Sequence, residues 1–138
     1  HILLGFSGKS RLSDIQAKKQ VNAVHRNKGI LEEIMGITSI AMNRLENEDS
    51  MDMIGQMIGA TWRFKRTLTK GLTNDKLDDI ISLSEKSGSL GGKLMGAGGG
   101  GFFMFMVPPE KHESFKQTMK KIKVWIPFKL NTKGSEIL

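Results

Sequence analysis

The residues with the clearest potential for chemistry form a glycine-rich stretch. From position 91 the sequence reads Gly-Gly-Lys-Leu-Met-Gly-Ala-Gly-Gly-Gly-Gly, and an apolar run from Phe102 to Val107 follows. Glycine adopts positive φ angles readily and leaves its amide uncovered, so such a run can curl around an anion. A flexible linker would be richer in serine and would not end in an apolar strand. The stretch therefore predicts a phosphate-binding loop, whose candidate residues are Gly96, Ala97, Gly98, Gly99 and Gly100. The other interpretation is that these glycines only allow a strand and a helix to pack closely.

A second candidate group lies near the N-terminus. Ser7, Gly8 and Arg11 combine a hydroxyl, a turn and a guanidinium near the end of the first predicted strand. Arginine binds phosphate through two parallel hydrogen bonds, so this group suits a sugar phosphate. The alternative is a surface turn followed by a helix that Ser13 caps. Lys93 also has two interpretations: it contacts a phosphate, or it is a solvated lysine at the end of a strand.

The composition is that of a globular domain with a basic surface. The 138 residues are 38% hydrophobic and 25% charged, and the formal net charge is +7. No arginine-rich block or basic strand studded with aromatic residues occurs, so nucleic acid is not an expected partner. The positive net charge therefore indicates either a phosphorylated substrate or a solvated lysine-rich exterior. No apolar run approaches the roughly 20 residues that span a membrane, so no membrane partner is expected.

Metal chemistry is not expected from this sequence. Cysteine is absent, which excludes a thiolate zinc site and fits a reducing compartment, so a cytoplasmic location is expected. His25 and His112 lie on predicted helices without a partner at metal-ligand spacing, and His1 is terminal. The chain begins with His1 rather than methionine and leads directly into a strand-like run, which suggests a fragment of a longer polypeptide.

The spacing of apolar residues predicts the elements that must position these groups. Short apolar runs predict strands, and three-four spacing predicts helices that face a core. The predicted order begins with a strand at 2–7, a helix at 13–27 and a helix at 30–45 whose core-facing stripe includes Met35 and Met42. After a break at 47–50, an antiparallel helix follows at 54–68, and then a helix that starts after the cap candidates at 73–75 and ends at 87–88. The order is completed by the glycine loop, a strand at 102–107, a helix from 109 to 122, a strand at 124–130 and an extended segment after Gly134. This order predicts an α+β fold in which a small sheet carries helices packed on one side.

Several residues within these elements carry expectations of their own. Ile15, Val21 and Val24 give the first helix a partly apolar face. Gly36 in the second helix is either a close packing point or a cost in helix stability of about 1 kcal/mol. Pro127 places the last strand at an edge or a bulge of the sheet. The side chains expected in the core include Trp62, Phe115, Met119, Ile122 and Trp125.

The stretch from Gly92 to Phe102 resembles the third conserved motif of the GHMP kinases, the superfamily of galactokinase, homoserine kinase and mevalonate kinase. Within that superfamily the sequence is most similar to the sugar kinases that phosphorylate D-glycero-D-manno-heptose 7-phosphate at its anomeric hydroxyl. Further stretches match that branch in the same order along the chain, at residues 7–13, 62–68 and 87–93.

The resemblance implies that residues 1–138 are a GHMP kinase C-terminal domain with a ferredoxin-like sheet. The N-terminal nucleotide-binding domain would be absent from this chain, together with the catalytic groups and most contacts to ATP and Mg²⁺. The partners implied are ATP and a sugar phosphate in the full-length enzyme, and the chain alone is expected to be inactive. The loop Gly96–Gly100 is expected to line the cleft between the two domains. Residues 87–92 look superficially like the family's nucleotide loop, but they follow a helix and precede the third motif, so we reject them as that loop.

A function of another class is a stand-alone ferredoxin-like module that binds a small metabolite or an anion without catalysis. That alternative would be favoured by a gene that begins near His1 and by binding of a sugar phosphate without nucleotide.

Overall fold

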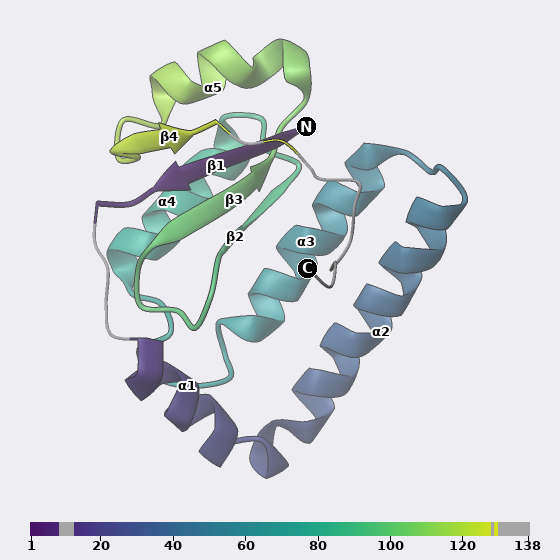
Figure 1. Ribbon diagram of the computed structural model, residues 1–138, viewed down its shortest axis with the longest axis vertical. Helices are drawn as coiled ribbons and strands as arrows, with labels where there is room; N and C mark the ends of the chain where they lie inside the picture. The colour runs from purple at the N-terminus through teal and green to yellow at the C-terminus, as the bar shows by residue number, and fades with distance from the viewer. Residues whose placement is uncertain (9–12, 128, 130–138) are drawn as a thin grey trace, which may run out of the picture.

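The computed structural model of the chain describes residues 1–8, 13–127 and 129. Within them the elements are β1 (Ile2–Phe6), α1 (Ser13–Asn22), α2 (Lys28–Glu46), α3 (Met51–Lys65), α4 (Asp75–Lys86), β2 (Gly91–Leu94), β3 (Phe102–Met106), α5 (His112–Thr118) and β4 (Val124–Ile126). Short 3₁₀ helices, His25–Asn27 and Pro109–Lys111, precede α2 and α5. The described strands form one antiparallel sheet in the order β2-β3-β1-β4 (Figure 1). The predicted α+β fold is therefore confirmed.

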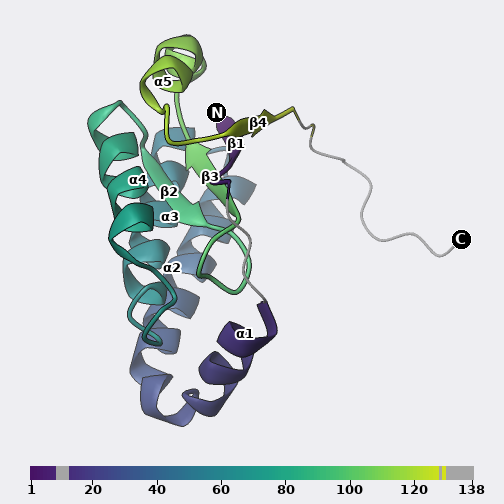
Figure 2. The ribbon, with the colours of Figure 1, turned by 90° about the vertical axis from the view of Figure 1, so that its left-hand side faces the viewer.

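One face of the sheet is covered by helices. Figures 1 and 2 show α4 behind the strands and α5 above β4. Phe103 and Phe105 are both fully buried on this face. The ring centroid of Phe105 lies 5.4 Å from that of Phe115 and 6.0 Å from that of Trp125. Trp62, Met119 and Ile122 are also buried, so these side chains lie in the core as the sequence predicted.

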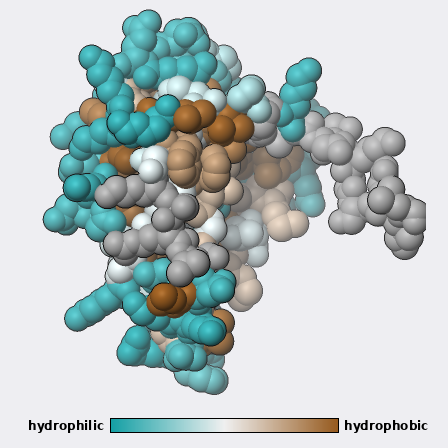
Figure 3. Space-filling model, turned by 60° about the vertical axis from the view of Figure 1, so that its left-hand side comes forward, coloured by the Kyte–Doolittle hydropathy of each residue, from teal (hydrophilic) through white to brown (hydrophobic). Residues whose placement is uncertain are grey.

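The opposite face of the sheet is apolar and partly open. The strand register places Phe102 and Val124 on either side of Phe6, and the Phe6 and Phe102 rings are 5.0 Å apart. Phe102 is 41% exposed and Val124 is 50% exposed. Figure 3 shows apolar side chains gathered on this side of the molecule. We call these three residues the open sheet face.

Helix α3 packs closely along the edge strand β2, and glycines make this approach possible. A Cβ atom at Gly91 would overlap the carbonyl oxygen of Gly55 and would lie 2.9 Å from the amide nitrogen of Gly59. Both obstructing atoms belong to the backbone of α3, so neither can move aside as a side chain would. Glycine is therefore required at the start of β2.

The strand β2 corrects one expectation. The glycine-rich composition predicts a loop for the whole stretch from residue 91, whereas Gly91–Leu94 is a strand paired with β3. The prediction was wrong because glycine is depleted in strands, and its close-packing role depends on a helix that is distant in sequence. The glycine loop proper is therefore the turn of a β-hairpin, residues 95–101.

The first helix was predicted less well. Helix α1 ends at Asn22 rather than at residue 27, and Ile15, Val21 and Val24 are 56%, 69% and 45% exposed. The predicted apolar face is therefore wrong. Polar contacts attach α1 to the rest of the domain instead. The Gln16 side chain, for example, donates to the Gly71 carbonyl at 3.1 Å. The Ser13 side chain and Arg11 lie outside what the structure describes, as do Phe128, Leu130 and Gly134.

Helix α2 lies beside α3 and runs antiparallel to it, as predicted (Figure 1). Its inner stripe, which includes Leu31 and Ile34, is half-buried, and none of its described residues is fully buried. Met35 and Met42, which the sequence placed on the core-facing stripe, are 65% and 59% exposed. The three-four pattern thus predicted the helix correctly but overstated its burial.

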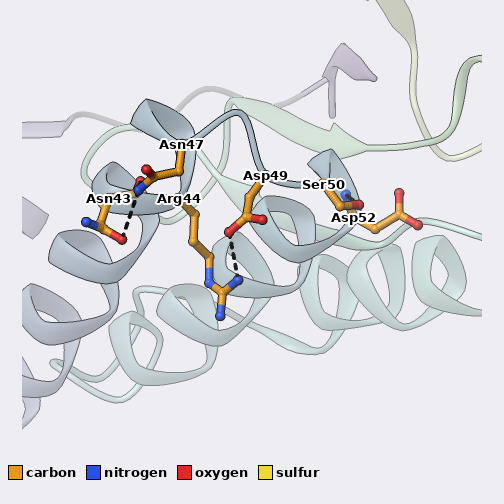
Figure 4. Close-up of polar contacts among 6 residues, drawn as sticks. All are labelled: Asn43, Arg44, Asn47, Asp49, Ser50 and Asp52. Carbon is orange, nitrogen blue, oxygen red and sulfur yellow. Dashed lines mark hydrogen bonds and ion pairs between the residues drawn. The ribbon is translucent and has the colours of Figure 1, made fainter.

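The turn between α2 and α3 is held by polar contacts. Arg44 donates from Nη1 to Asp49 at 3.0 Å, and the Asn47 side chain donates to the side-chain oxygen of Asn43 at 3.4 Å (Figure 4). The Asn47 side chain also donates to the backbone carbonyl of Asn43 at 2.7 Å. Ser50 caps α3 by accepting from the Asp52 amide at 3.2 Å. The break that the sequence predicted at residues 47–50 is therefore a defined turn. At the other end of the chain, β4 is an edge strand, as predicted. It ends at Ile126, before Pro127, whereas the sequence predicted a strand that runs through this proline.

Replacing Gly36 by alanine is expected to stabilise the chain by about 0.5–1 kcal/mol, because glycine inside a helix loses more conformational entropy on folding. A Cβ at Gly36 meets no atom within 4 Å, so the close-packing interpretation does not hold and no clash opposes this gain. Urea unfolding followed by circular dichroism would measure the change. A loss of stability would show that α2 is not helical at this position.

Candidate functional site

The candidate site is built around the loop of the β2–β3 hairpin. Gly96, Gly98 and Gly99 have φ angles of 71°, 101° and 82°, in the region that glycine adopts without strain. Gly100 and Gly101 continue the series at 151° and 111°. Side chains at these positions would resist this path, so the run of glycines gives the loop its shape.

Contacts from other elements fix the carbonyl side of the loop. Lys65 Nζ, at the end of α3, donates to the Gly96 carbonyl oxygen at 2.7 Å, and Gln20 Nε2 of α1 donates to the Ala97 carbonyl oxygen at 2.7 Å. The Gly99 amide donates to the Leu72 carbonyl at 2.8 Å. The loop is therefore held in place by both backbone and side chains, unlike a linker.

The amide side of the same loop is largely unused. Within the described part of the chain, no hydrogen bond is made by the amides of four loop residues: Gly96, Ala97, Gly98 and Gly100. Successive backbone amides without a partner can bind an anion where they point into one concavity. The geometry is thus suited to a phosphate group, as the sequence predicted, although ligand binding by these residues stays a prediction.

The tight-packing interpretation of the glycines holds at one position and fails at another. A Cβ at Gly98 would lie 2.7 Å from Cγ of Leu72 and 2.9 Å from its carbonyl oxygen, so Gly98 is required for packing. A Cβ at Gly96 or Gly101 meets nothing within 4 Å. Packing therefore does not explain the loop as a whole.

The first strand brings a second predicted group to the loop. The Ser7 amide donates to the Gly101 carbonyl at 3.0 Å, and the Gly101 amide donates to Ser7 Oγ at 3.3 Å. Gly8 follows with a φ angle of 80°, and its Cα lies against Lys123, whose Cγ would be 2.7 Å from an added Cβ. The structure thus unites Ser7 and Gly8 with the glycine loop, while Arg11 lies outside the described residues.

A hollow opens between this junction and the start of α4. Its volume is about 720 Å³, and Ser7 and Gly99 line it together with the first turn of α4. Lys121 and Lys123 also line it, and Lys121 is paired with Asp79 at 2.8 Å. The predicted turn and loop therefore border a cavity large enough for a small phosphorylated molecule.

Two lysines lie at the base of the loop. Lys93 is half-buried on β2, and Lys65 is half-buried beside Gly96. Burial lowers the pKa of Lys65 below its usual value, and the ammonium of Lys93 lowers it further. Lys93 was a candidate site residue from the sequence, whereas Lys65 was not. A signal was present, because Lys65 interrupts the apolar stripe of its helix with a charge.

The described residues contain no group of three or more histidine and acidic side chains that could hold a metal ion. None of the described helices has the length and hydropathy needed to cross a membrane. The chemistry that the described site residues offer is therefore the binding of negative charge by amides and ammonium groups.

The family description "GHMP kinases C terminal" matches residues 42–122, a range that includes α3, α4 and the entire glycine hairpin. The chain belongs to the GHMP kinase C-terminal family. The resemblance seen in the glycine motif is thereby confirmed, and the hairpin with its anchored loop is a feature of a GHMP kinase domain.

Named relatives of this GHMP domain are kinases. The chain is 35% identical over 68 residues to D-glycero-alpha-D-manno-heptose 7-phosphate kinase of Campylobacter jejuni, a match that covers 49% of this chain and 20% of that protein. It is 29% identical over 130 residues to mevalonate kinase of Thermococcus sibiricus, covering 86% of this chain and 37% of that protein. The chain thus spans between a fifth and two fifths of the length of these relatives.

The fold of the GHMP domain is also found in solved structures. The crystal structure of L. major mevalonate kinase in complex with R-mevalonate matches with a TM-score of 0.76 and 16% identity, over 91% of this chain and 40% of that one. At this identity the likeness shows the fold alone. It supports the same α+β arrangement of sheet and helices.

Proposed function

We propose that this chain is the C-terminal, substrate-side domain of a longer ATP-dependent sugar kinase, which transfers the γ-phosphate to a hydroxyl of a sugar such as heptose 7-phosphate. The observation that carries the proposal is the anchored hairpin loop of a GHMP domain, in which the amides of Gly96, Ala97, Gly98 and Gly100 are uncommitted among the described residues. The name and 35% identity of the Campylobacter jejuni relative support the choice of heptose phosphate. The small share of each relative that the chain covers supports a partner domain elsewhere in the polypeptide.

Phosphoryl transfer needs positioning and charge neutralisation more than covalent chemistry from the protein. A fixed set of amides supplies both, because they need not reorganise when charge moves onto the transferred group. In this proposal the loop amides hold phosphate oxygens at one side of a cleft. Ser7 and Gly8 place the sugar phosphate beside them, with Arg11 as a further phosphate contact and Lys93 as a cation.

ATP supplies the phosphoryl group and Mg²⁺ neutralises its charge when they are bound. The described residues suit phosphate oxygens through amide and ammonium donors, and they offer no set of carboxylates for a magnesium ion. We therefore assign the magnesium ligands, the catalytic base and most nucleotide contacts to the domain outside this chain.

The open sheet face fits this arrangement. Phe6 directly precedes Ser7, and Phe102 directly follows Gly101, so the apolar surface continues into the candidate site. An exposed apolar patch of this kind typically marks an interaction surface. We propose that the remainder of the longer polypeptide covers it, which would bring that part of the protein to the glycine loop.

The proposal predicts acceptor specificity in the full-length protein. With ATP and Mg²⁺, heptose 7-phosphate should support ADP release, and mevalonate at the same concentration should give at most about 1% of that rate, because the predicted site is built for a sugar phosphate. A coupled ADP assay with both acceptors would measure this. Faster turnover of mevalonate would overturn the sugar assignment and leave the kinase assignment in place.

A further inference from the structure

The inward face of α1 carries two glutamine side chains one turn apart. Gln16 is 6% exposed and donates to the Gly71 carbonyl. Gln20 is half-buried and donates to the Ala97 carbonyl at 2.7 Å. An inward face that only packed against the domain would be apolar, because burying a polar side chain costs free energy unless it forms hydrogen bonds. This face of α1 is therefore suited to holding backbone carbonyls.

The Gln20 side chain is itself held in place by its own helix. Its Nε2 also donates to the Gln16 carbonyl at 3.3 Å, so both hydrogens of this amide group have an acceptor. Lys65 Nζ makes the corresponding contact from the end of α3, to the Gly96 carbonyl at 2.7 Å. Two successive loop carbonyls are thus fixed by side chains that lie 77 and 31 residues away in the sequence.

Fixing a carbonyl also fixes the amide of the same peptide unit. In a trans peptide unit, the carbonyl oxygen and the following amide hydrogen point in opposite directions. The contact at Gly96 therefore turns the Ala97 amide away from Lys65. The contact at Ala97 likewise turns the Gly98 amide away from Gln20. Within the described part of the chain these two amides make no hydrogen bond, so each is available to an acceptor on the side away from its anchor.

The glycines of the loop make such anchors necessary. Gly96 and Gly98 have φ angles of 71° and 101°, and glycine adopts positive and negative φ angles with similar ease. A peptide unit next to a glycine can therefore turn over and exchange the directions of its amide and its carbonyl. Packing does not prevent this at Gly96, where a Cβ would meet nothing within 4 Å. The direction of the loop amides then depends on the side chains that hold the carbonyls.

We propose that Gln20 and Lys65 are positioning residues of the glycine loop: by holding two successive carbonyls, they direct the next two amides toward a bound phosphate group. Those amides belong to Ala97 and Gly98. Neither anchoring side chain contacts the phosphate in this proposal. The inference rests on the proposed function for the molecule that carries the phosphate, which is a nucleotide or the sugar phosphate. It adds α1 to the parts of the chain on which the phosphate site depends.

Nuclear magnetic resonance of the labelled chain tests the orientation. The nuclear Overhauser effect between an amide proton and the Cα proton of the preceding residue depends on the direction of that amide. Gln20→Met removes the donor and should change this signal at Gly98 far more than at Ala97, whereas Lys65→Met should do the reverse. Gln56→Met, the matched change at an exposed position on α3, should change neither. Unchanged signals at both amides in Gln20→Met would overturn the proposal.

Inorganic phosphate tests what the orientation achieves. Phosphate should shift the amide resonances of Ala97 and Gly98 in the wild-type chain until they saturate. Gln20→Met and Lys65→Met should each weaken this binding by about ten- to a hundredfold, because a misdirected amide loses its hydrogen bond to a charged group. Gln20 is uncharged, so its effect cannot arise from general attraction, and it decides the test if Lys65→Met does not fold. Gln56→Met should change the affinity by less than about twofold. No saturable shift in the wild type, or equal affinity in Gln20→Met, would overturn the proposal.

Two further probes distinguish the source of the phosphate. ADP and glucose 6-phosphate would be compared for shifts at the same two amides, and the tighter binder identifies the nucleotide or the sugar phosphate. In the longer kinase that we propose, Gln20→Met should lower kcat/KM at least about tenfold, because the amides would no longer be preorganised. Weakened phosphate binding in Gln20→Met, in a protein without ATP-dependent transfer, would retain the positioning role and reject the kinase. Kinase activity with an unchanged kcat/KM in Gln20→Met would reject the positioning role and retain the kinase.

Discussion

Gly91→Ala is expected to lower the free energy of unfolding by about 3 kcal/mol or more, the largest effect on stability that we predict. The added methyl group would overlap the Gly55 carbonyl oxygen and approach the Gly59 amide nitrogen to 2.9 Å. Relief would require α3 to move away from β2 as a unit. Urea unfolding followed by circular dichroism would measure the loss.

Gly36→Ala is the matched control for this prediction. The chemical change is the same, but the open position on α2 makes the expected effect opposite in sign. A Gly91→Ala variant as stable as Gly36→Ala would mean that α3 does not pack on β2 as described. The described placement of Lys65 near Lys93, which depends on this packing, would then be wrong.

Gly96→Ala is expected to have the largest effect on catalysis. In the longer kinase that we propose, we expect a loss of about 100-fold in kcat/KM, because a small displacement of positioned groups is enough for such a loss. The new methyl group meets no atom within 4 Å, so the cost in stability should be only the left-handed backbone strain of about 1–2 kcal/mol. Steady-state kinetics and urea unfolding on the same preparation would separate the two effects.

Gly88→Ala is the control for Gly96→Ala. Gly88 also has a positive φ angle, 95°, but it follows α4 and its added methyl would meet only the flexible Lys111 side chain, at 3.1 Å. We expect a similar loss of stability and less than a threefold change in kcat/KM, because the strain lies away from the loop. Equal kinetic losses in the two variants would assign the loop a structural role only. Gly98 is less suitable for this test because Leu72 already blocks substitution there.

The helices could be predicted from the sequence because their signals are local. The three-four spacing from Leu31 to Leu45 predicted α2, and the candidates at Thr73–Asp75 included Asn74, which caps α4 through the Leu77 amide at 3.2 Å. Depth of burial was harder to predict. It depends on which partner a helix face meets, and in α1 polar contacts such as that of Gln16 replace the apolar face.

The site could be predicted only in part. The glycine run revealed the loop, because only glycine fits its φ angles. Its partners could not be found in this way, since Gln20 and Ala97 are 77 residues apart and Ser7 and Gly101 are 94 apart. Such contacts follow from sheet register and helix packing, which no local pattern records. Strand β2 was missed for the same reason, because its glycines are needed for close packing against α3, a helix that is distant in sequence.

Whether catalysis needs a domain outside this chain is tested most directly by comparing ADP release by the proposed longer kinase, called the full-length protein below, with ADP release by this chain alone. Both would be assayed with ATP, Mg²⁺ and heptose 7-phosphate at equal molar concentration. The account predicts acceptor-dependent ADP release by the full-length protein and none above background by the 138-residue chain, because the catalytic base and magnesium ligands are assigned elsewhere. Acceptor-dependent turnover by the chain alone, or its absence from the full-length protein with both heptose 7-phosphate and mevalonate, would contradict the account.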